Sequence, residues 1–330
     1  MGQILQATDH NLNLCKQALR NSKVIAVPTE TVYGLAGNAL DEVALEAIFK
    51  IKGRPLFNPL ILHTDCLENA EKFATFNSLA RQLAEKLWPG PLTIILPKKA
   101  IVPNLVTANL DSVAIRCPQH PIFLKLLRIL PFPLAAPSAN PFGYVSPTSA
   151  DHVNNSLGDK LEFILDGADS EIGIESTIVD LRNSDAPKIL RPGPISKEIL
   201  EAKTHIEFKE PQTAQVSELR APGMLKSHYS PKTSLEITSL DQLNGLIASD
   251  QGSRCAFIFQ KRPKESIYPK SSCIYWLSEN GSAKEIARNI YRVLRVTDAL
   301  NYEKIYIEAI SDTEGLSVAL KDRLSKAASK

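Results

Sequence analysis

The chain has 330 residues, of which 44% are hydrophobic and 22% are charged, and its formal net charge is +2. This composition is that of a globular protein with a sizeable core, and it excludes a disordered chain and a uniformly basic nucleic-acid-binding protein. There is no apolar run long enough to cross a bilayer, no secretory signal at the start, and no metal-ligand spacing among the five cysteines. The sequence therefore predicts a cytoplasmic protein with reduced thiols, no membrane contact and no metal site of its own.

Apolar strands alternate with helices from the start of the chain to about residue 205, which indicates an α/β domain. Strands are predicted at 24–27, 60–63, 92–97, 113–118, 133–140, 162–167, 176–181 and 188–193. A helix is predicted over 41–52, with Asp41 as its N-cap and with Val43, Ala47, Ile48 and Ile51 on its buried face. Two further helical stretches end at Trp88, and another covers 123–130.

A helix is also predicted within "SPTSADHVNNSLG", residues 146–158. Ser146 is a good N-cap, Pro147 fits the first helical position, and Gly158 fits the position just after the last turn. Because the N-terminus of a helix favours anions, Ser146 is also a candidate anion ligand.

Residues 206–232 are polar and interrupted by proline and glycine, which is typical of a linker. Beyond them, strands at 234–238, 255–259, 273–277 and 304–310 alternate with helices near 241–248, 282–300 and 317–328. The helix at 282–300 carries an apolar stripe. The sequence therefore predicts three parts, namely a catalytic domain over 1–205, a linker over 206–232 and a small α/β domain over 233–330.

Polar side chains gather at strand ends of the first domain, where open α/β sheets bind ligands, although no P-loop or GxGxxG is present. They occur in "PTETVYGLAG" (28–37), in "KIKGRPLFNPLILH" (50–63), at Arg116, and in "APSAN" and "GIESTIVD" further on. An arginine on a buried strand needs an anionic partner, either a ligand or an internal carboxylate, and the sequence leaves both open for Arg116. Together these residues predict a cationic pocket for a phosphate-bearing ligand.

Seven motifs, in order, resemble those of the YrdC-domain family: "PTETVYGLAGNAL", "KGRPLFNPLILH", "WPGPLT", "VAIRCPQHP", "APSANPFGYVSPT", "GIESTIVD" and "ILRPG". The linker "APGMLKSHYSP" and the small domain after it resemble the long, two-domain threonylcarbamoyl-AMP synthases of this family. The resemblance implies an open, twisted α/β sheet with a concave basic face, followed by a smaller Rossmann-like α/β domain.

The resemblance also implies a nucleotidyltransferase reaction. L-threonine, bicarbonate or CO2, and ATP with Mg²⁺ would give threonylcarbamoyl-AMP and pyrophosphate. Partner proteins would then use this product to modify tRNAs that read codons beginning with A, and direct contact with tRNA is an open expectation.

The site residues implied by the resemblance fall into three groups. L-threonine would bind at Thr31, His63, Arg116 and Ser176. ATP would bind at Arg54, Asn58, Ser138, Ser146, Arg191 and Tyr229. The reactive centre would contain Lys52, Arg54, Ser138 and Asn140, with Lys52 and Arg54 in a loop facing the triphosphate.

Tyr229 lies in a linker whose Met224, Leu225 and His228 are unsuited to a solvated tether, so we expect this linker to fold over the pocket as a lid. Two other functions remain open at this point. One is a carbamoyl-phosphate-dependent YrdC-type enzyme, although the acylphosphatase-like and zinc-finger segments of such proteins are missing. The other is a non-catalytic protein that binds structured RNA or tRNA through the basic face.

Overall fold

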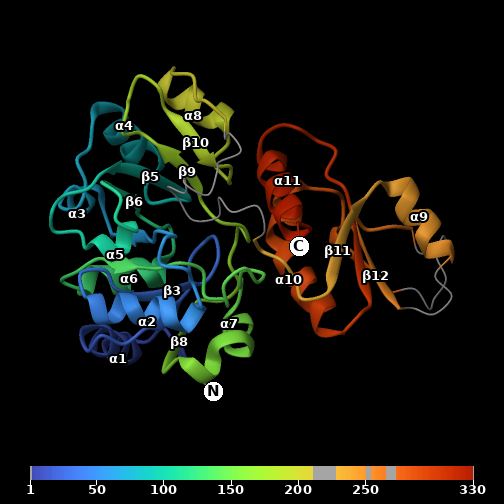
Figure 1. Ribbon diagram of the computed structural model, residues 1–330, viewed down its shortest axis with the longest axis horizontal. Helices are drawn as coiled ribbons and strands as arrows, with labels where there is room; N and C mark the ends of the chain where they lie inside the picture. The colour runs from blue at the N-terminus through green and yellow to red at the C-terminus, as the bar shows by residue number, and fades with distance from the viewer. Residues whose placement is uncertain (1, 211–227, 250–253, 265–272, 330) are drawn as a thin grey trace.

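The computed structural model describes residues 2–210, 228–249, 254–264 and 273–329. Two parts lie side by side, a larger one formed by the first two thirds of the chain and a smaller one formed by the last third (Figure 1). A large mixed sheet belongs to the first part and a small parallel sheet to the second, so the predicted fold class is confirmed. None of the described helices is both long and apolar enough to cross a membrane.

The larger sheet has ten strands among the described residues, in the order β1-β8-β2-β3-β7-β4-β6-β5-β9-β10. They are β1 (Gln3–Gln6), β2 (Ile25–Val27), β3 (Gly34–Asn38), β4 (Ile61–His63), β5 (Leu92–Pro97), β6 (Ser112–Arg116), β7 (Leu134–Ala135), β8 (Phe163–Asp166), β9 (Thr177–Asp180) and β10 (Lys188–Arg191). Strand β4 runs parallel to β6 and antiparallel to β7, which brings His63 beside Arg116. This pairing puts the ends of separate strands at one place in the sheet.

Helices cover both faces of this sheet. They are α1 (Asp9–Arg20), α2 (Glu42–Lys52), α3 (Leu67–Ala70), α4 (Ser78–Leu87), α5 (Asn104–Thr107), α6 (Pro121–Ile129), α7 (Ala150–Leu157), the 3-10 turn η1 (Gly158–Lys160) and α8 (Lys197–Thr204). Successive residues of β2 alternate between the two faces, as the pleat requires. Ile25 and Val27 pack in the cluster that holds α1 and α6, whereas Ala26 packs with residues of α2 and α4.

The smaller part is a four-stranded parallel sheet in the order β11-β14-β12-β13 among the described residues. Its strands are β11 (Ser234–Thr238), β12 (Cys255–Lys261), β13 (Cys273–Ser278) and β14 (Lys304–Glu308), and its helices are α9 (Leu240–Ser249), α10 (Ala283–Ala299) and α11 (Leu316–Ala327). Helix α10 buries the predicted apolar stripe of Ile286, Ile290, Val293 and Leu294.

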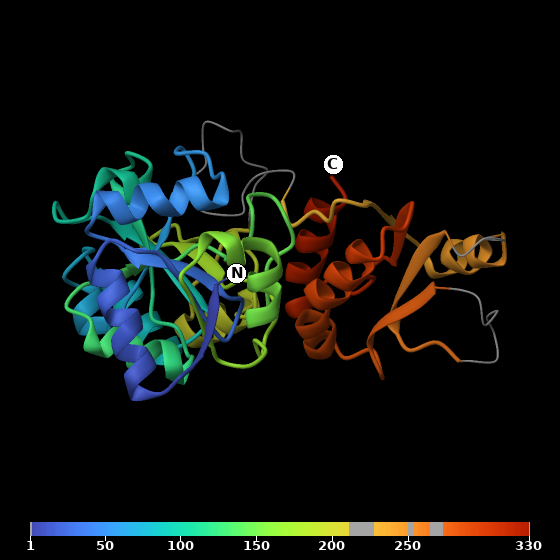
Figure 2. The same ribbon diagram turned by 90° about the horizontal axis from the view of Figure 1, so that it is seen from below.

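Helices α10 and α11 stand between the small sheet and the larger part of the molecule (Figure 2). One hydrophobic cluster crosses this boundary, because Val32, Val145 and Ile174 of the larger part pack with Tyr229 and with side chains of α10 and α11. The two parts therefore share a continuous core.

Two helix predictions were wrong in detail. Val43 is 65% exposed, and α2 instead buries Ala44, Leu45, Ile48 and Phe49, a face displaced from the predicted one. Its N-cap at Asp41 is confirmed, since the side chain accepts from Val43 N.

The second error concerns α7. This helix begins at Ala150, and the Ser149 side chain caps it by accepting from His152 N. Ser146 and Pro147 precede the helix, so Ser146 is not at its N-terminus. Gly158 does follow the last helical residue, but its φ is −59° rather than left-handed.

The linker lies mostly outside the described residues, which resume at His228, and Met224 and Leu225 lie outside them as well. Helix α8 ends at Thr204 and β11 begins at Ser234. We retain the division into 1–205, 206–232 and 233–330 as a proposal.

Candidate active site

A pocket opens where the loops after β2, α2 and β7 meet the ends of β4, β6, β9 and β10. Its lining residues include eight of those expected from the sequence: Thr31, Arg54, His63, Arg116, Ser138, Ser176, Arg191 and Tyr229. These side chains come from segments spread over some two hundred positions of the chain. The structure thus brings them together at one site, while their individual roles remain predictions.

Four expected residues, Lys52, Asn58, Asn140 and Ser146, do not line the pocket. Three of them are hydrogen-bonded to residues that do line it: Asn58 to Arg54, Lys52 to Ser138 and Ser146 to Glu175. All four are buried. They form the support of the pocket wall.

Arg54 is held in place by the loop that follows α2. Gly53 ends the helix with a left-handed φ of 63°, a conformation that suits glycine, and this turn directs the chain back toward the sheet. Arg54 Nε donates to Asn58 O (3.1 Å), and its Nη2 donates to Asn58 Oδ1 (2.7 Å) and to Pro59 O (2.8 Å). Asn58 therefore orients Arg54, whose buried guanidinium lines the pocket.

Lys52 contradicts the expectation that it lies in a loop facing the triphosphate. It is the last residue of α2, and its buried Nζ donates to Ser138 O (2.6 Å) and to Asn140 O (2.7 Å). Burial, with the charge of Arg54 nearby, lowers the pKa of Lys52 well below its ordinary value. Lys52 thus fixes the 138–140 loop.

Arg116, on β6, is paired with an internal carboxylate, one of the two alternatives left open by the sequence. Its Nη2 lies 2.6 Å from Glu30 Oε1, its Nη1 donates to Thr31 Oγ1 (3.1 Å), and its Nε donates to Gly90 O (3.2 Å). Both charged side chains are buried. The pair fixes the guanidinium at the pocket wall.

Arg191, at the end of β10, forms the third cationic element. Its Nε and Nη2 donate to Ser176 O and Ser176 Oγ, both at 3.0 Å, and Thr93 Oγ1 lies 2.8 Å from Ser176 Oγ. Burial, and to a lesser degree the charges of neighbouring arginines, lowers the pKa of Arg191 and brings that of Arg54 to about 9. Buried cations that disfavour one another's charge favour an anionic ligand between them.

His63 adds a neutral polar group. Its Nδ1 lies 3.1 Å from Ile61 O, and because a carbonyl can only accept, Nδ1 carries the proton. Burial, helped by the charge of Arg116, lowers the pKa of His63 to about 3. The imidazole is therefore uncharged at neutral pH.

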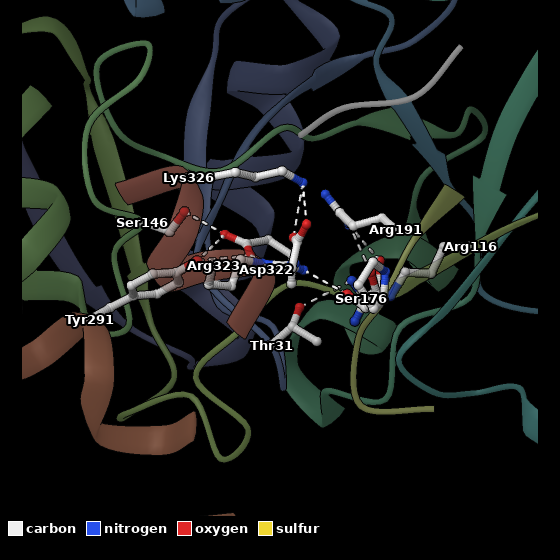
Figure 3. A network of polar contacts seen from close by, with 11 residues as sticks. Thr31, Arg116, Ser146, Ser176, Arg191, Tyr291, Asp322, Arg323 and Lys326 are labelled. Carbon is white, nitrogen blue, oxygen red and sulfur yellow. Dashed lines mark hydrogen bonds and ion pairs between the residues drawn. The ribbon is translucent and has the colours of Figure 1, made fainter. Parts of the chain in front are cut away.

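Glu175 also lines the pocket, although only its neighbour Ser176 was predicted from the sequence. Ser146 Oγ donates to Glu175 Oε1 (2.6 Å), so the buried hydroxyl supports this carboxylate rather than capping a helix. Arg323 of α11 forms an ion pair with Oε2 at 2.7 Å (Figure 3). The quoted motif contained Glu175, but nothing local in the sequence marks Arg323.

The end of the linker closes one side of the pocket. His228 and Tyr229 are buried and line it. Tyr229 has a φ of 65°, which is uncommon for a residue with a side chain. Its Oη, like Nδ1 of His228, has no hydrogen-bond partner among the described residues. A buried polar atom without a protein partner at a pocket wall is suited to a ligand.

Comparisons with known proteins settle the family. The family profile described as "Telomere recombination" matches residues 17–193, and the one described as "Threonylcarbamoyl-AMP synthase, C-terminal domain" matches residues 195–329. A threonylcarbamoyl-AMP synthase from Pyrococcus abyssi is 40% identical over 321 residues, which cover 94% of this chain and 91% of the relative. The chain belongs to the threonylcarbamoyl-AMP synthase family.

Two solved structures of P. abyssi Sua5 resemble the whole molecule. The complex with L-threonine has a TM-score of 0.89 at 37% identity and covers 99% of this chain and 97% of its own. A double variant, in which an adjacent histidine and tyrosine are replaced by alanine, has a TM-score of 0.90 at 36% identity and covers 99% and 96%. The resemblance inferred from the motifs is confirmed, and membership of the threonylcarbamoyl-AMP synthase family makes this chain a nucleotidyl-transferring enzyme.

Proposed function

We propose that the protein joins L-threonine, bicarbonate or CO2, and ATP into threonylcarbamoyl-AMP, with release of pyrophosphate. The observation that carries this proposal is the buried pocket that holds the guanidinium groups of Arg54, Arg116 and Arg191 together with hydroxyl groups and a neutral histidine. Such a pocket is suited to an amino-acid carboxylate and a polyphosphate at once.

L-threonine binds beside β4, β6 and β9. Arg116 takes its carboxylate, since a planar guanidinium matches a carboxylate and Glu30 and Thr31 hold it in place. Thr31, His63 and Ser176 supply neutral polar groups around the amine and hydroxyl. The relative solved with L-threonine supports this choice of amino acid.

ATP binds toward the linker. Arg54, oriented by Asn58, and Arg191 meet the phosphates, and Ser138 lies on the loop that Lys52 fixes. Tyr229 directs its unpartnered hydroxyl toward the nucleotide. An adjacent His and Tyr also occur in P. abyssi Sua5, which has been solved with both replaced by alanine.

The reaction needs positioning and charge neutralisation. The threonine amine captures CO2 as a carbamate, with loss of a proton. A carbamate oxygen attacks the α-phosphorus of ATP, the bond to the β-phosphate oxygen breaks, and pyrophosphate leaves. Arg54 and Arg191 stabilise the charge that develops on the phosphates.

Mg²⁺ enters as part of the Mg–ATP substrate. Among the described residues no group of three or more His, Cys, Asp or Glu side chains could hold a metal ion. Glu30 and Glu175 are each paired with an arginine, which leaves the phosphates as the main ligands of the ion.

The product is activated for transfer of the threonylcarbamoyl group, and we propose that cytosolic partner proteins pass this group to tRNAs that read codons beginning with A. The test of the first step is pyrophosphate release from ATP, measured with each amino acid and with or without bicarbonate. Release that requires both threonine and bicarbonate supports the proposal. Release that is equally fast without either one, or with serine in place of threonine, contradicts it.

A further inference from the structure

The carboxylate of Glu175, which lines the pocket, is hydrogen-bonded by three side chains. Oε1 accepts from Ser146 Oγ (2.6 Å), and Oε2 accepts from Arg323 Nε (2.7 Å). The hydroxyl of Tyr291 lies within reach of both oxygens, at 3.3 and 3.0 Å. Two of these three partners come from the small domain, from α10 and α11, and reach across the boundary between the domains (Figure 3).

The same two residues also hold Tyr229. The Tyr229 ring stacks on the Tyr291 ring with 5.8 Å between centroids, and the guanidinium of Arg323 lies 5.3 Å from the centre of the Tyr229 ring. Arg323 is completely buried, and its Nη2 donates to Pro192 O (3.1 Å), next to Arg191. One pair of side chains therefore fixes two separate elements of the pocket wall.

Other contacts on the boundary join residues that do not line the pocket. Tyr144 Oη donates to Asp298 Oδ2 (2.7 Å), and Arg295 donates to Val145 O and Ser146 O. These contacts, like those of Tyr291, are hydrogen bonds that join the two domains. Packing of the domains alone therefore does not account for the placement of Tyr291 and Arg323 at the pocket carboxylate.

We propose that the small domain positions the ATP side of the pocket through Tyr291 and Arg323, which hold Glu175 and Tyr229 in the orientation that ATP requires. Tyr291 and Arg323 are positioning residues, since neither lines the pocket. Arg116, assigned to threonine, donates to Gly90, Thr31 and Glu30, and neither Tyr291 nor Arg323 is among these partners. His63, also assigned to threonine, has Nδ1 beside Ile61 O. The inference rests on the proposed function, because ATP is the ligand whose affinity it concerns.

The decisive test compares Tyr291→Phe with Tyr144→Phe. Each variant removes one tyrosine hydroxyl that donates to a carboxylate across the domain boundary. The acceptor of Tyr291, Glu175, lines the pocket, whereas the acceptor of Tyr144, Asp298, does not. We expect the KM and calorimetric Kd for ATP to rise about fivefold in Tyr291→Phe, the value of one typical hydrogen bond. The KM for threonine and the melting temperature should match those of Tyr144→Phe, in which ATP affinity is unchanged.

A second set of variants tests whether Arg323 affects ATP binding through its contact with Glu175. Arg323→Gln and Glu175→Gln should each weaken ATP binding, and the double variant should lose no more than the larger single effect, because both changes break the same contact. Arg323→Lys, which keeps the charge, should restore part of the ATP affinity.

The outcomes separate this inference from the proposed function. Equal ATP affinities in Tyr291→Phe and Tyr144→Phe, or additive effects at 175 and 323, would overturn the positioning role alone. A wild-type protein that binds ATP but releases no pyrophosphate with threonine and bicarbonate would overturn the proposed function alone. Failure of the wild-type protein to bind ATP would overturn both.

Discussion

Nη2 of Arg116 lies 2.6 Å from Oε1 of Glu30, and both side chains are buried. Of the two, Arg116 lines the pocket. A buried ion pair of this kind fixes the direction of the guanidinium, because loss of either partner would leave an uncompensated charge. Glu30 Oε2 has no hydrogen-bond partner among the described residues. The ion pair with Glu30 therefore holds the Arg116 guanidinium in one orientation before a substrate binds.

The first prediction follows from this geometry. Arg116→Lys should raise the Kd for L-threonine about tenfold or more, since hydrogen bonds to charged groups contribute roughly 1.5–3 kcal/mol and lysine lacks the planar fork. ATP affinity should change little. Calorimetric titration of each substrate checks this, with Arg182→Lys as control, because Arg182 pairs with Asp180 away from the pocket. Unchanged threonine affinity would reduce Arg116 to a structural partner of Glu30.

Lys52 should behave as a structural residue. Lys52→Met removes the donor to Ser138 O and Asn140 O, and a buried carbonyl left without a partner costs about 1–3 kcal/mol. We expect a lower midpoint in urea unfolding together with a loss of activity. Activity lost at full stability would mean instead that the ammonium acts on substrate.

Replacement of Arg54, in contrast to that of Lys52, should lower activity without lowering stability. Arg54→Lys retains a cation but cannot reproduce the bonds to Asn58 and Pro59 that orient the guanidinium toward the pocket. The rate of pyrophosphate release should fall roughly 10²–10³-fold, as for other lost transition-state contacts. The unfolding midpoint should stay close to that of the wild-type protein, and a matching collapse of stability would assign Arg54 to the fold.

Acid should weaken the fold through Glu175. Burial raises the pKa of Glu175, but the charges of Arg323 and Arg191 and the Ser146 hydrogen bond outweigh it and lower the pKa from 4.5 to about 2. Because the folded pKa is depressed, this contribution is fully present above pH 4.5 and is lost as the pH falls toward 2. Its size is on the order of 3 kcal/mol, since one pKa unit corresponds to about 1.4 kcal/mol.

Urea unfolding of the wild-type protein and of Glu175→Gln, at neutral and at acidic pH, measures this contribution. The variant should be the less stable protein at neutral pH, and the two free energies of unfolding should converge in acid. Parallel curves would show that Glu175 is not the group that titrates.

Tyr229→Phe should separate function from stability. The Tyr229 hydroxyl is buried without a partner among the described residues, so its removal should leave the melting temperature unchanged or raise it. The ring contacts with Tyr291 and Arg323 remain. ATP affinity should nevertheless fall, as calorimetry can show. Full ATP affinity in this variant would show that the Tyr229 hydroxyl does not contribute to ATP binding.

Much of the fold could be predicted from local patterns. Short apolar runs give most of the strands, and the stripe from Ile286 to Leu294 gives α10, because periodicity reports directly on burial. Strands β1 and β3 were not predicted, because "QILQ" and "GLAGN" are not such runs. The start of α7 could not be predicted this way. "SPTS" offers several hydroxyl residues able to cap a helix, and the distant Glu175 engages Ser146 and leaves the cap to Ser149.

The residues of the site could be predicted where they lie in motifs. Residues that hold the site from distant parts of the sequence could not be predicted. Eight expected residues line the pocket. Strand ends and the loops beside them carry six of these, whereas Arg54 follows helix α2 and Tyr229 lies in the linker. Whether Arg116 pairs internally depended on the rotamer of Glu30, and the inward direction of Lys52 depended on the loop it holds. Arg323 sits on an ordinary amphipathic helix, and only the packing of two domains reveals its partner.

Glu175 precedes Arg323 by 148 positions, so the two residues are added to the growing chain at different times. At about 5–20 residues per second, a ribosome needs roughly 7–30 s to travel from one codon to the other. During that interval the emerging first domain carries Glu175 without Arg323, its ion-pair partner. The nascent chain therefore cannot assemble the finished pocket until α11 has been synthesised and docked.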